Sequence, residues 1–434
     1  MGEHTNRRDF LKGIGAASVV STAGCIGGGG GGSQGPDLLV VIGYPESGIQ
    51  LFRDYYSQAS GDRDILVPDG LRQADMPGQV GNDMANVTGT APAAGGPNQE
   101  AFNGLFEDRY GESPGVFTSQ TYDSVAIQIL ANAAAGENDG PAVKEQMRRV
   151  ANPGGMEVGP QNFLEGVEAA MNGEDVNYQG ASSSTNFNEM GDPASAAYAI
   201  WTFDAENNAV SNETVQNFEG ENPEGSGPSA DSGPGGSGRT ISIGILLPET
   251  GDLGSVGQPM IQAGQIPVRQ VNESDLELEV DANVQDTQTS PDAGVAAAQN
   301  LASAGVPSVC GSASSGVNVP VSQEVFIPNQ MVGCSPSSTA LSVSNLEDDD
   351  FIFRTAPSDF LQGRVMAQVA SERLEASTAS TLYVNNDYGQ QLSDRFSSVF
   401  QDTFDGEVYQ QVGFNIGESS YSSVIERALS EPSN

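Results

Sequence analysis

The sequence predicts an α/β protein built on parallel β-sheets, and two observations support this fold class. Short runs that are apolar throughout, such as LLVVI at residues 38–42, alternate with longer amphipathic segments such as residues 122–136. Strands without a polar face are typical of a parallel sheet that helices cover on both sides. The chain has 434 residues, which is room for about two or three domains.

A first α/β segment is predicted over residues 36–210. Its strands are the short apolar runs, and its helices have apolar residues at helical spacing. The last strand contains Trp201, the only tryptophan. The expected elements are strand 37–44, helix 47–59, strand and loop 64–70, helix 100–111, helix 122–136 and strand 197–203.

A linker is predicted at residues 211–238, because most of this stretch is glycine, proline, serine and acidic residues. A second α/β segment follows over residues 239–434. Ligands bind beyond the carboxyl ends of strands in such sheets, so we expect function in the loops after the strands of both segments. The expected elements are strand and loop 240–255, helix 292–305, strand 306–311, helical turn 319–327, strand and loop 330–338, helix 363–376, strand and loop 380–389 and helix 391–404.

The first and last elements of the chain each lack the neighbour that an α/β fold requires. Residues 420–434 place Tyr421, Val424, Ile425 and Leu429 on one face of a helix. Such a helix normally leads into a strand, because its apolar face must cover a sheet. Strand 37–44, in turn, has no helix before it. The two segments are not repeats of one another.

The charge of the chain limits its partners. The formal net charge is −40, from 57 acidic and 17 basic residues, and the acids are spread along the whole chain. This balance argues against nucleic acid as a partner, because its phosphates would be repelled. An acid-rich, lysine-poor composition resembles that of proteins from halophiles with a salt-filled cytoplasm. Salt at 1 M shortens the screening length to about 3 Å, so such a charge is tolerable there.

The N-terminal residues predict export and membrane anchoring. Residues 1–24 contain Arg7 and Arg8, a weakly apolar run and small residues directly before Cys25. This pattern is typical of a twin-arginine signal that ends in a lipoprotein cleavage site, which would place lipid on Cys25 at the outer face of the cell membrane. Cleavage without lipid is the alternative. Residues 25–35, rich in glycine, are expected to form a flexible tether.

Cysteine and histidine usage narrows the chemistry. Cys310 and Cys334 each end a short apolar run, as two neighbouring parallel strands would. Outside the cell a disulfide between them is expected, with two buried free thiols as the alternative. The only histidine is His4, inside the predicted signal. We therefore expect no catalytic triad, no metal site and no cofactor in the exported protein.

The motifs of both segments resemble one receptor family. Residues 240 onward carry ISIGILLPETGDLGS, VCGSASSGVNVP, GCSPSSTALS, FRTAPSDFLQG and LYVNNDYGQQL, and these resemble the first part of the leucine/isoleucine/valine-binding proteins. Members of that family are the extracellular receptors of branched-chain amino-acid ABC importers. Residues 36–206 carry PDLLVVIGYPESG, ILVPDG, TYDSVAIQIL and NYQGASSSTNFNEMGDP, which resemble the remainder.

The order of the two parts is the reverse of the family's, so the sequence resembles a circular permutant. Joining residue 434 to residue 36 would make the last helix and the first strand consecutive. The linker would then connect the family's two original ends, and a flexible coil of its length spans about 30 Å. The alternative is a recombined gene whose product folds poorly, or only as a swapped dimer.

The resemblance implies a fold of two Rossmann-like lobes with parallel sheets, joined by three hinge strands, with ligand held between them. One lobe would contain residues 239–358 and 92–180. The other would contain residues 360–434, 36–91 and 181–210. Capture of the ligand would then occur by closure of the lobes about the hinge.

The resemblance also implies ligand-binding residues. Ser315 and Thr339 are expected to hold a ligand carboxylate, and Ser337 to offer its backbone carbonyl. Asp69 would bind the ammonium, although the family has a longer glutamate there. Tyr44 and Tyr388 match aromatic positions beside the ligand. Val256 stands where the family would have an aromatic residue, which puts its side-chain pocket in doubt. Weaker candidates are Glu46 and Asp359.

Each of these residues also has an ordinary structural explanation. Serine and threonine after strands are common as helix N-caps. Asp69, which precedes a glycine, fits a turn, and tyrosine in such loops can pack against the hinge. What favours binding is that the candidates follow strands in both segments.

Three functions agree with these features to different degrees. The first is a lipid-anchored receptor that binds an amino acid or an amide and passes it to ABC permease and ATPase subunits. The second is a ligand-sensing ectodomain of the same fold without transport. The third, an extracellular hydrolase using a serine of SASSG or SPSST, lacks a histidine base and a nucleophile elbow.

Overall fold

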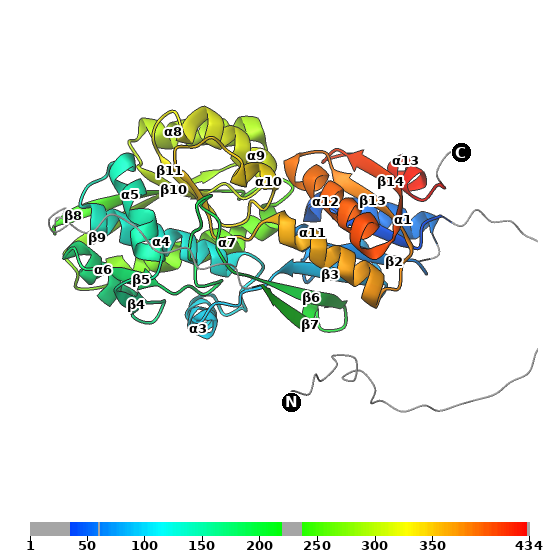
Figure 1. Ribbon diagram of the computed structural model, residues 1–434, viewed down its shortest axis with the longest axis horizontal. Coiled ribbons are helices and arrows are strands. Elements are labelled where there is room, and N and C mark those ends of the chain that lie inside the picture. The colour runs from blue at the N-terminus through cyan, green and yellow to red at the C-terminus, as the bar shows by residue number, and fades with distance from the viewer. Residues whose placement is uncertain (1–34, 60, 219–236, 432–434) are drawn as a thin grey trace, which may run out of the picture. The chain divides into compact units, whose positions relative to one another are not determined.

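A computed structural model describes residues 35–59, 61–218 and 237–431 (Figure 1). The described residues belong to one compact unit. The predicted signal, Cys25 and most of the tether and linker lie outside the described residues. No helix among the described residues is long and apolar enough to cross a bilayer.

The larger sheet has seven strands and defines lobe 2. Its first five strands are parallel, β6 is antiparallel to β3, and β7 is antiparallel to β6. Strand β1 is fully buried because every residue in it is aliphatic. In spatial order the strands are β14 (Glu407–Phe414), β13 (Thr378–Val384), β1 (Leu38–Ile42), β2 (Asp64–Val67), β3 (Val87–Pro92), β6 (Ala196–Asp204) and β7 (Ala209–Phe218).

Helices from both ends of the sequence cover this sheet. Figure 1 shows α11 and α12 (orange) beside α1, β2 and β3 (blue), so late and early parts of the chain lie together. The helices of lobe 2 are α1 (Pro45–Gln58), α2 (Met76–Val80), α11 (Asp359–Gln368), α12 (Asp387–Phe404) and α13 (Ser422–Ala428).

The smaller sheet has five strands, all parallel, and defines lobe 1. Its strands in spatial order are β12 (Ile352–Arg354), β11 (Val332–Ser335), β10 (Ser308–Gly311), β8 (Arg239–Leu247) and β9 (Leu278–Asp286). A parallel pair, β4 (Met156–Val158) and β5 (Val176–Tyr178), forms a separate two-stranded sheet. The helices of lobe 1 are α3 (Gln99–Tyr110), α4 (Thr118–Ala135), α5 (Gly140–Ala151), α6 (Phe163–Met171), α7 (Gly254–Asn272), α8 (Pro291–Ser303), α9 (Ser315–Val321) and α10 (Leu341–Ser344).

Three segments connect the two lobes. They are residues 93–98 after β3, residues 179–195 before β6 and residues 355–358 after β12. The predicted fold class, two α/β lobes with parallel sheets, is therefore confirmed. Backbone hydrogen bonds join the first two segments, for example from the Gly95 amide to the Ser182 carbonyl. A ligand site is expected at the carboxyl ends of the strands of both sheets.

The first and last described elements are neighbours in space. Strand β1 lies between β13 and β2 and is parallel to both. A Cβ placed on Gly35 would lie 2.2 Å from the carbonyl oxygen of Leu429, just after α13. The two segments of the chain thus complete one sheet, and α13 contacts β13, β14 and α1.

Two sequence predictions differ from the structure. Residues 211–218, assigned to the linker, belong to strand β7, whose mostly exposed polar residues gave no apolar pattern. Cys310 and Cys334 are free and fully buried, so the predicted disulfide is not present. They are register partners on adjacent parallel strands, where side chains on one face point side by side rather than toward each other. Burial raises the pKa of the Cys310 thiol to about 12, so it stays protonated.

Candidate functional site

A small cavity of about 20 Å³ lies between the lobes. Space of this size holds about one water molecule, so the lobes are packed closely around it. Lobe 2 contributes Tyr44, Asp69, Gly70 and Tyr388. Lobe 1 contributes polar residues and a larger apolar group of lining residues. The polar residues are Ser314, Ser315 and Ser337. The apolar group of lining residues is Phe117, Pro248, Leu253, Val256, Met260 and Ala313.

The strand ends explain why these residues meet. Tyr44 and Asp69 follow β1 and β2, and Tyr388 follows β13. In lobe 1, Ser315 follows β10 and Ser337 follows β11. Because neighbouring parallel strands end at the same edge of a sheet, each lobe presents a row of loops to the cavity.

The two serine-rich loops of lobe 1 are bonded to each other. The Ser335 and Ser338 hydroxyls donate to the carbonyl oxygen of Ser312, at 2.6 and 2.9 Å. The Ser337 hydroxyl donates to the Ala313 carbonyl at 3.2 Å, and the Ala340 amide donates to Ser315 Oγ at 3.2 Å. The loops therefore form one surface of hydroxyl and peptide groups.

Asp69 brings a buried carboxyl group to the opposite wall. Its Oδ1 accepts a hydrogen bond from Gln362 Nε2 at 2.6 Å, and its Oδ2 accepts a longer one from the Tyr388 hydroxyl at 3.4 Å. Burial raises the pKa of Asp69 to about 6. A carboxyl group with this pKa is ionised at neutral pH but titrates close to it.

Asp359 lies behind Asp69, at the start of α11, and is also fully buried. Burial raises its pKa well above the usual value, and the nearby charge of Asp69 acts in the same direction. The Thr339 hydroxyl and Arg354 favour its ionised form, but neither carboxyl oxygen makes a hydrogen bond of good geometry. The Thr339 hydroxyl and Gln362 Oε1 are likewise buried without a hydrogen-bond partner. The deep end of the site is therefore rich in unpaired acceptors.

Tyr44 bridges the lobes beside the cavity. Its hydroxyl lies 2.8 Å from Ser314 Oγ of lobe 1 and accepts a hydrogen bond from Asn386 Nδ2 of lobe 2 at 3.0 Å. Its ring stacks on that of Tyr388, with 5.7 Å between the ring centroids. Burial raises the pKa of Tyr44, so the hydroxyl remains a donor.

A second bridge joins Asp252 of lobe 1 to the first turn of α1. Asp252 Oδ1 accepts hydrogen bonds from the Ser47 amide at 3.1 Å and from the Ser47 hydroxyl at 2.6 Å. The amides of a helix's first turn have no partner within the helix, so a carboxylate is favoured there. With both bridges formed, the lobes are in a closed arrangement.

The structure brings most of the predicted site residues together. Tyr44, Asp69, Ser315, Ser337 and Tyr388 line the cavity. Thr339 and Asp359 do not line it but lie next to each other behind Asp69. Glu46 lies outside: its side chain is exposed on α1, and only its backbone amide reaches lobe 1. Its place in the helix's first turn directs it to solvent.

Several apolar lining residues were not predicted. Phe117 has a left-handed backbone conformation (φ 62°), which is unusual for a bulky residue and turns its ring to the cavity. Leu253 and Met260 come from the start of α7, after a loop that was recognised only as following a strand. Nothing in the sequence separates such residues from ordinary core residues, so only packing between distant segments identifies them.

Part of the chain is similar to known proteins. Residues 240–432 match the family model described as periplasmic binding protein. A search of curated proteins finds no match.

Solved structures that are similar include a leucine-binding protein from Thermotoga maritima (24% identity, TM-score 0.40, 43% of this chain and 53% of that one). Another is a branched-chain amino-acid transporter substrate-binding protein from Streptococcus pneumoniae in complex with isoleucine (22% identity, TM-score 0.39, 44% of this chain and 53% of that one). A third is an ABC-transporter solute-binding protein from Rhodopseudomonas palustris in complex with 3,4-dihydroxybenzoic acid (16% identity, TM-score 0.39, 43% of this chain and 51% of that one). The matched region spans about half the length of these proteins.

Proposed function

We propose that this protein is an extracellular substrate-binding protein of an ABC importer, which captures a small amino acid or a similar amide by closure of its two lobes. The observation that carries the proposal is the cavity between the lobes, with hydroxyl and peptide groups on one wall and the buried carboxyl group of Asp69 on the other. The match of residues 240–432 to the periplasmic binding protein family supports it.

The proposed ligand is a zwitterion with a compact apolar side chain. Its ammonium would lie between Asp69 and Asp359, where buried acceptors lack partners. Its carboxylate would be held by Ser315 and by Thr339, which lies behind the lining residues, and the Ser337 carbonyl would accept a hydrogen bond from the ammonium. No basic side chain lines the cavity, so hydroxyl and backbone donors would carry the anionic end. The apolar group of lining residues would then enclose the side chain.

Binding accounts for the site better than catalysis does. The hydroxyls of Ser335, Ser337 and Ser338 donate to backbone carbonyls rather than to a base. The sequence from residue 35 onward contains no histidine. Among the described residues no three Cys, Asp or Glu side chains are arranged to hold a metal ion. A sensing receptor would use the same closure, and partner proteins distinguish it from a transport receptor.

We further propose that the chain is a circular permutant in which residues 239–431 supply the first part of the receptor and residues 35–218 the rest. The contact between Gly35 and Leu429 and the position of β1 beside β13 support this. A gene encoding residues 239–431 before residues 35–218 should give the same fold and the same ligand affinity. Failure of the reordered chain to fold would contradict the permutation.

We also propose that lipid on Cys25 anchors the protein outside the cell after twin-arginine export, since the motif before Cys25 supports it. Cys25→Ser, expressed in a salt-accumulating host, should move the protein from the membrane fraction to the medium. Retention in the membrane would contradict the anchor.

The ligand assignment is tested by calorimetric titration of L-leucine, other apolar amino acids and their amides in molar salt. Asp69→Ala and Thr339→Ala should each weaken binding roughly 10- to 150-fold, because each removes a charge-assisted contact of about 1.5–3 kcal/mol. Since both residues contact one ligand, the double variant should be less than additive. Glu46→Gln, outside the cavity, is the control. Unchanged affinity in both single variants would contradict the site.

A further inference from the structure

Arg354, at the end of β12, is fully buried and has a partner for every N–H group. Its Nε and Nη2 donate to the two carboxylate oxygens of Asp192, at 2.6 and 2.8 Å. Its Nη2 also donates to Ser344 Oγ. Its Nη1 donates to the carbonyl oxygens of Ser338 and Ala340, both at 3.0 Å. A buried arginine with such complete pairing is unusual, because desolvation of the charge must be offset by each of these bonds.

The partners of Arg354 belong to two different parts of the molecule. Ser338 and Ala340 flank Thr339 in the loop that also carries Ser337. Asp192 belongs to residues 179–195, one of the three segments that connect the lobes, and the Arg354 amide donates to Gly191 of the same segment at 3.0 Å. Arg354 itself directly precedes the third connecting segment. Its guanidinium group therefore holds the binding loop against one of the three connections and lies next to the start of another.

We infer that Arg354 is a positioning residue for ligand binding: it fixes the loop around Thr339 and links that loop to the hinge segment through Asp192. This inference rests on the proposed function for the part of its test that measures affinity. The planar guanidinium group is essential for this positioning, because the ammonium group of a lysine cannot bond two carbonyl oxygens and a carboxylate in these directions.

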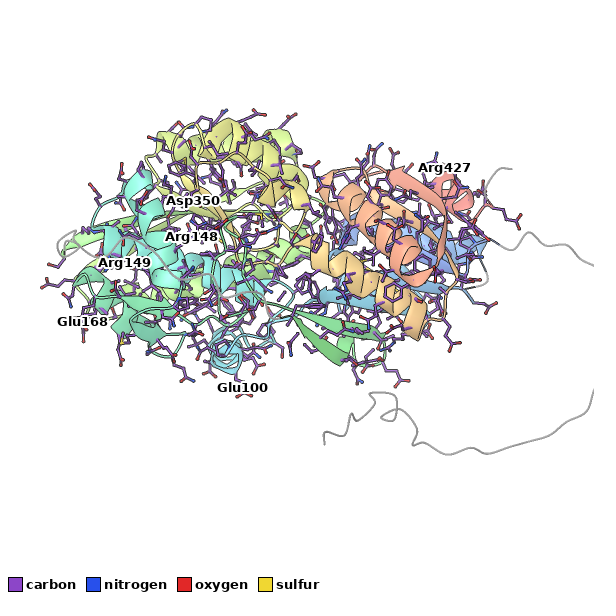
Figure 2. All side chains as sticks on the ribbon, viewed as in Figure 1. Glu100, Arg148, Arg149, Glu168, Asp350 and Arg427 are labelled. Atoms are coloured by element: carbon purple, nitrogen blue, oxygen red, sulfur yellow. The ribbon has the colours of Figure 1, made fainter. Side chains whose placement is uncertain are left out.

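The chain offers a matched control in Arg149 on α5, which is labelled in Figure 2. Arg149 is also buried, and its Nε donates to Asp175 at 2.7 Å while its Nη2 donates to the Gly173 carbonyl at 2.9 Å. None of its hydrogen-bond partners is in a cavity loop or a connecting segment. Arg149→Lys therefore removes a comparable guanidinium group without affecting the proposed link between the Thr339 loop and Asp192.

The first measurement needs no ligand. Hydrogen exchange in a peptide covering residues 335–346 should become at least about tenfold faster in Arg354→Lys, because the Ser338 and Ala340 amides lose the fixed geometry of their bonds to Ser335 and Ser315. The same peptide should be unchanged in Arg149→Lys. If Arg354→Lys does not fold, Asp192→Asn, which removes the charge of the partner and keeps its shape, replaces it. Unchanged exchange in the folded variant overturns the inference.

The second measurement is the affinity for L-leucine. Arg354→Lys should bind about tenfold more weakly than wild type, and in the Thr339→Ala background the same change should have a smaller effect, because it acts through that loop. A fully additive loss, or an equal loss in Arg149→Lys, overturns the inference. If wild type does not bind L-leucine, the ligand assignment is wrong, and the exchange measurement still decides the role of Arg354.

Discussion

Two fully buried aspartates, Asp123 on α4 and Asp359 on α11, have opposite surroundings. Asp123 accepts four hydrogen bonds: from the Tyr178 hydroxyl at 2.7 Å, the Ala181 amide at 2.9 Å, the Ser182 amide at 2.7 Å and the Ser182 hydroxyl. Asp359 has no partner of good geometry on either oxygen. Burial raises the pKa of both groups, so the difference lies in their partners.

This difference separates structural carboxyl groups from those that await a ligand. The four donors around Asp123 hold the beginning of a connecting segment in place, and nothing remains for a ligand to supply. The burial of Asp359 is only weakly offset, by the nearby Thr339 hydroxyl and Arg354, and a buried polar group of that kind is a marker of function. Asp69 and Asp252 are intermediate, because each has some partners and Asp252 Oδ2 has none.

The largest contrast should appear in stability. Asp123→Ala should lower the free energy of unfolding by about 4 kcal/mol, because it leaves several buried donors without an acceptor. Asp359→Asn should leave stability unchanged or raise it slightly, because it removes an unpaired buried acid. Urea unfolding of both variants in the same salt measures the contrast. Similar losses in the two variants would show that Asp359 has structural partners after all.

The second prediction concerns pH and Asp69. Its folded-state pKa of about 6 lies above the usual 3.8, so the folded protein holds this proton more tightly than the unfolded chain does. The contribution of Asp69 to the free energy of unfolding is therefore fully present below pH 3.8 and is lost as the pH rises to about 6. The shift of about two pKa units corresponds to about 3 kcal/mol. Asp69→Asn should thus gain about that much relative to wild type between pH 4 and pH 7.5.

The matched control for this experiment is Asp62→Asn, which changes an exposed carboxyl group of the same lobe. The stability of Asp62→Asn relative to wild type should not rise between pH 4 and pH 7.5 as that of Asp69→Asn does. The affinity for leucine should depend on pH in the opposite direction to the stability, because an ammonium prefers the ionised carboxylate. Wild-type binding should therefore weaken as the pH falls below about 6. A stability difference between Asp69→Asn and wild type that is constant with pH would mean that Asp69 is not desolvated in solution.

The parts of this architecture that the sequence predicts are those with a strong local pattern. Strand β1 is entirely aliphatic and β13 ends in the run Leu-Tyr-Val, so their positions and the loops carrying Tyr44 and Tyr388 follow directly. Strand β7 was missed because it is an edge strand whose polar residues face solvent. For Cys310 and Cys334 the disulfide was expected and the alternative, two buried free thiols, is found, since sequence can suggest adjacent strands but not the direction of two side chains.

The bridges between the lobes could not be predicted, because they depend on the relative position of distant segments. Asp252 and Ser47 are 205 residues apart. Asp252 belongs to a loop that reads only as a turn, and Ser47 to a helix start. Nothing in either stretch indicates that the carboxylate of one completes the first turn of the other.

The third prediction tests this bridge. Asp252→Ala should weaken leucine binding roughly tenfold or more, because the closed form loses a hydrogen-bonded carboxylate at the start of α1. Small-angle scattering should show a larger radius of gyration, since the lobes open more often. Ser47→Ala, which keeps the backbone amide bond, should have a smaller effect. A compact Asp252→Ala variant with full affinity would show that this bridge does not contribute to closure.

The smallest effect is expected for Tyr44→Phe. The change removes only the hydroxyl group that joins Ser314 of lobe 1 to Asn386 of lobe 2, and it keeps the ring that stacks on Tyr388. A single neutral hydrogen bond is worth about 1 kcal/mol, so leucine affinity should fall about fivefold. Ser314→Ala should give a similar loss, and the double variant should add little, because both changes break one contact. Calorimetric titration of the three variants measures this. Additive losses would mean that Tyr44 and Ser314 act on the ligand separately rather than through the bond between the lobes.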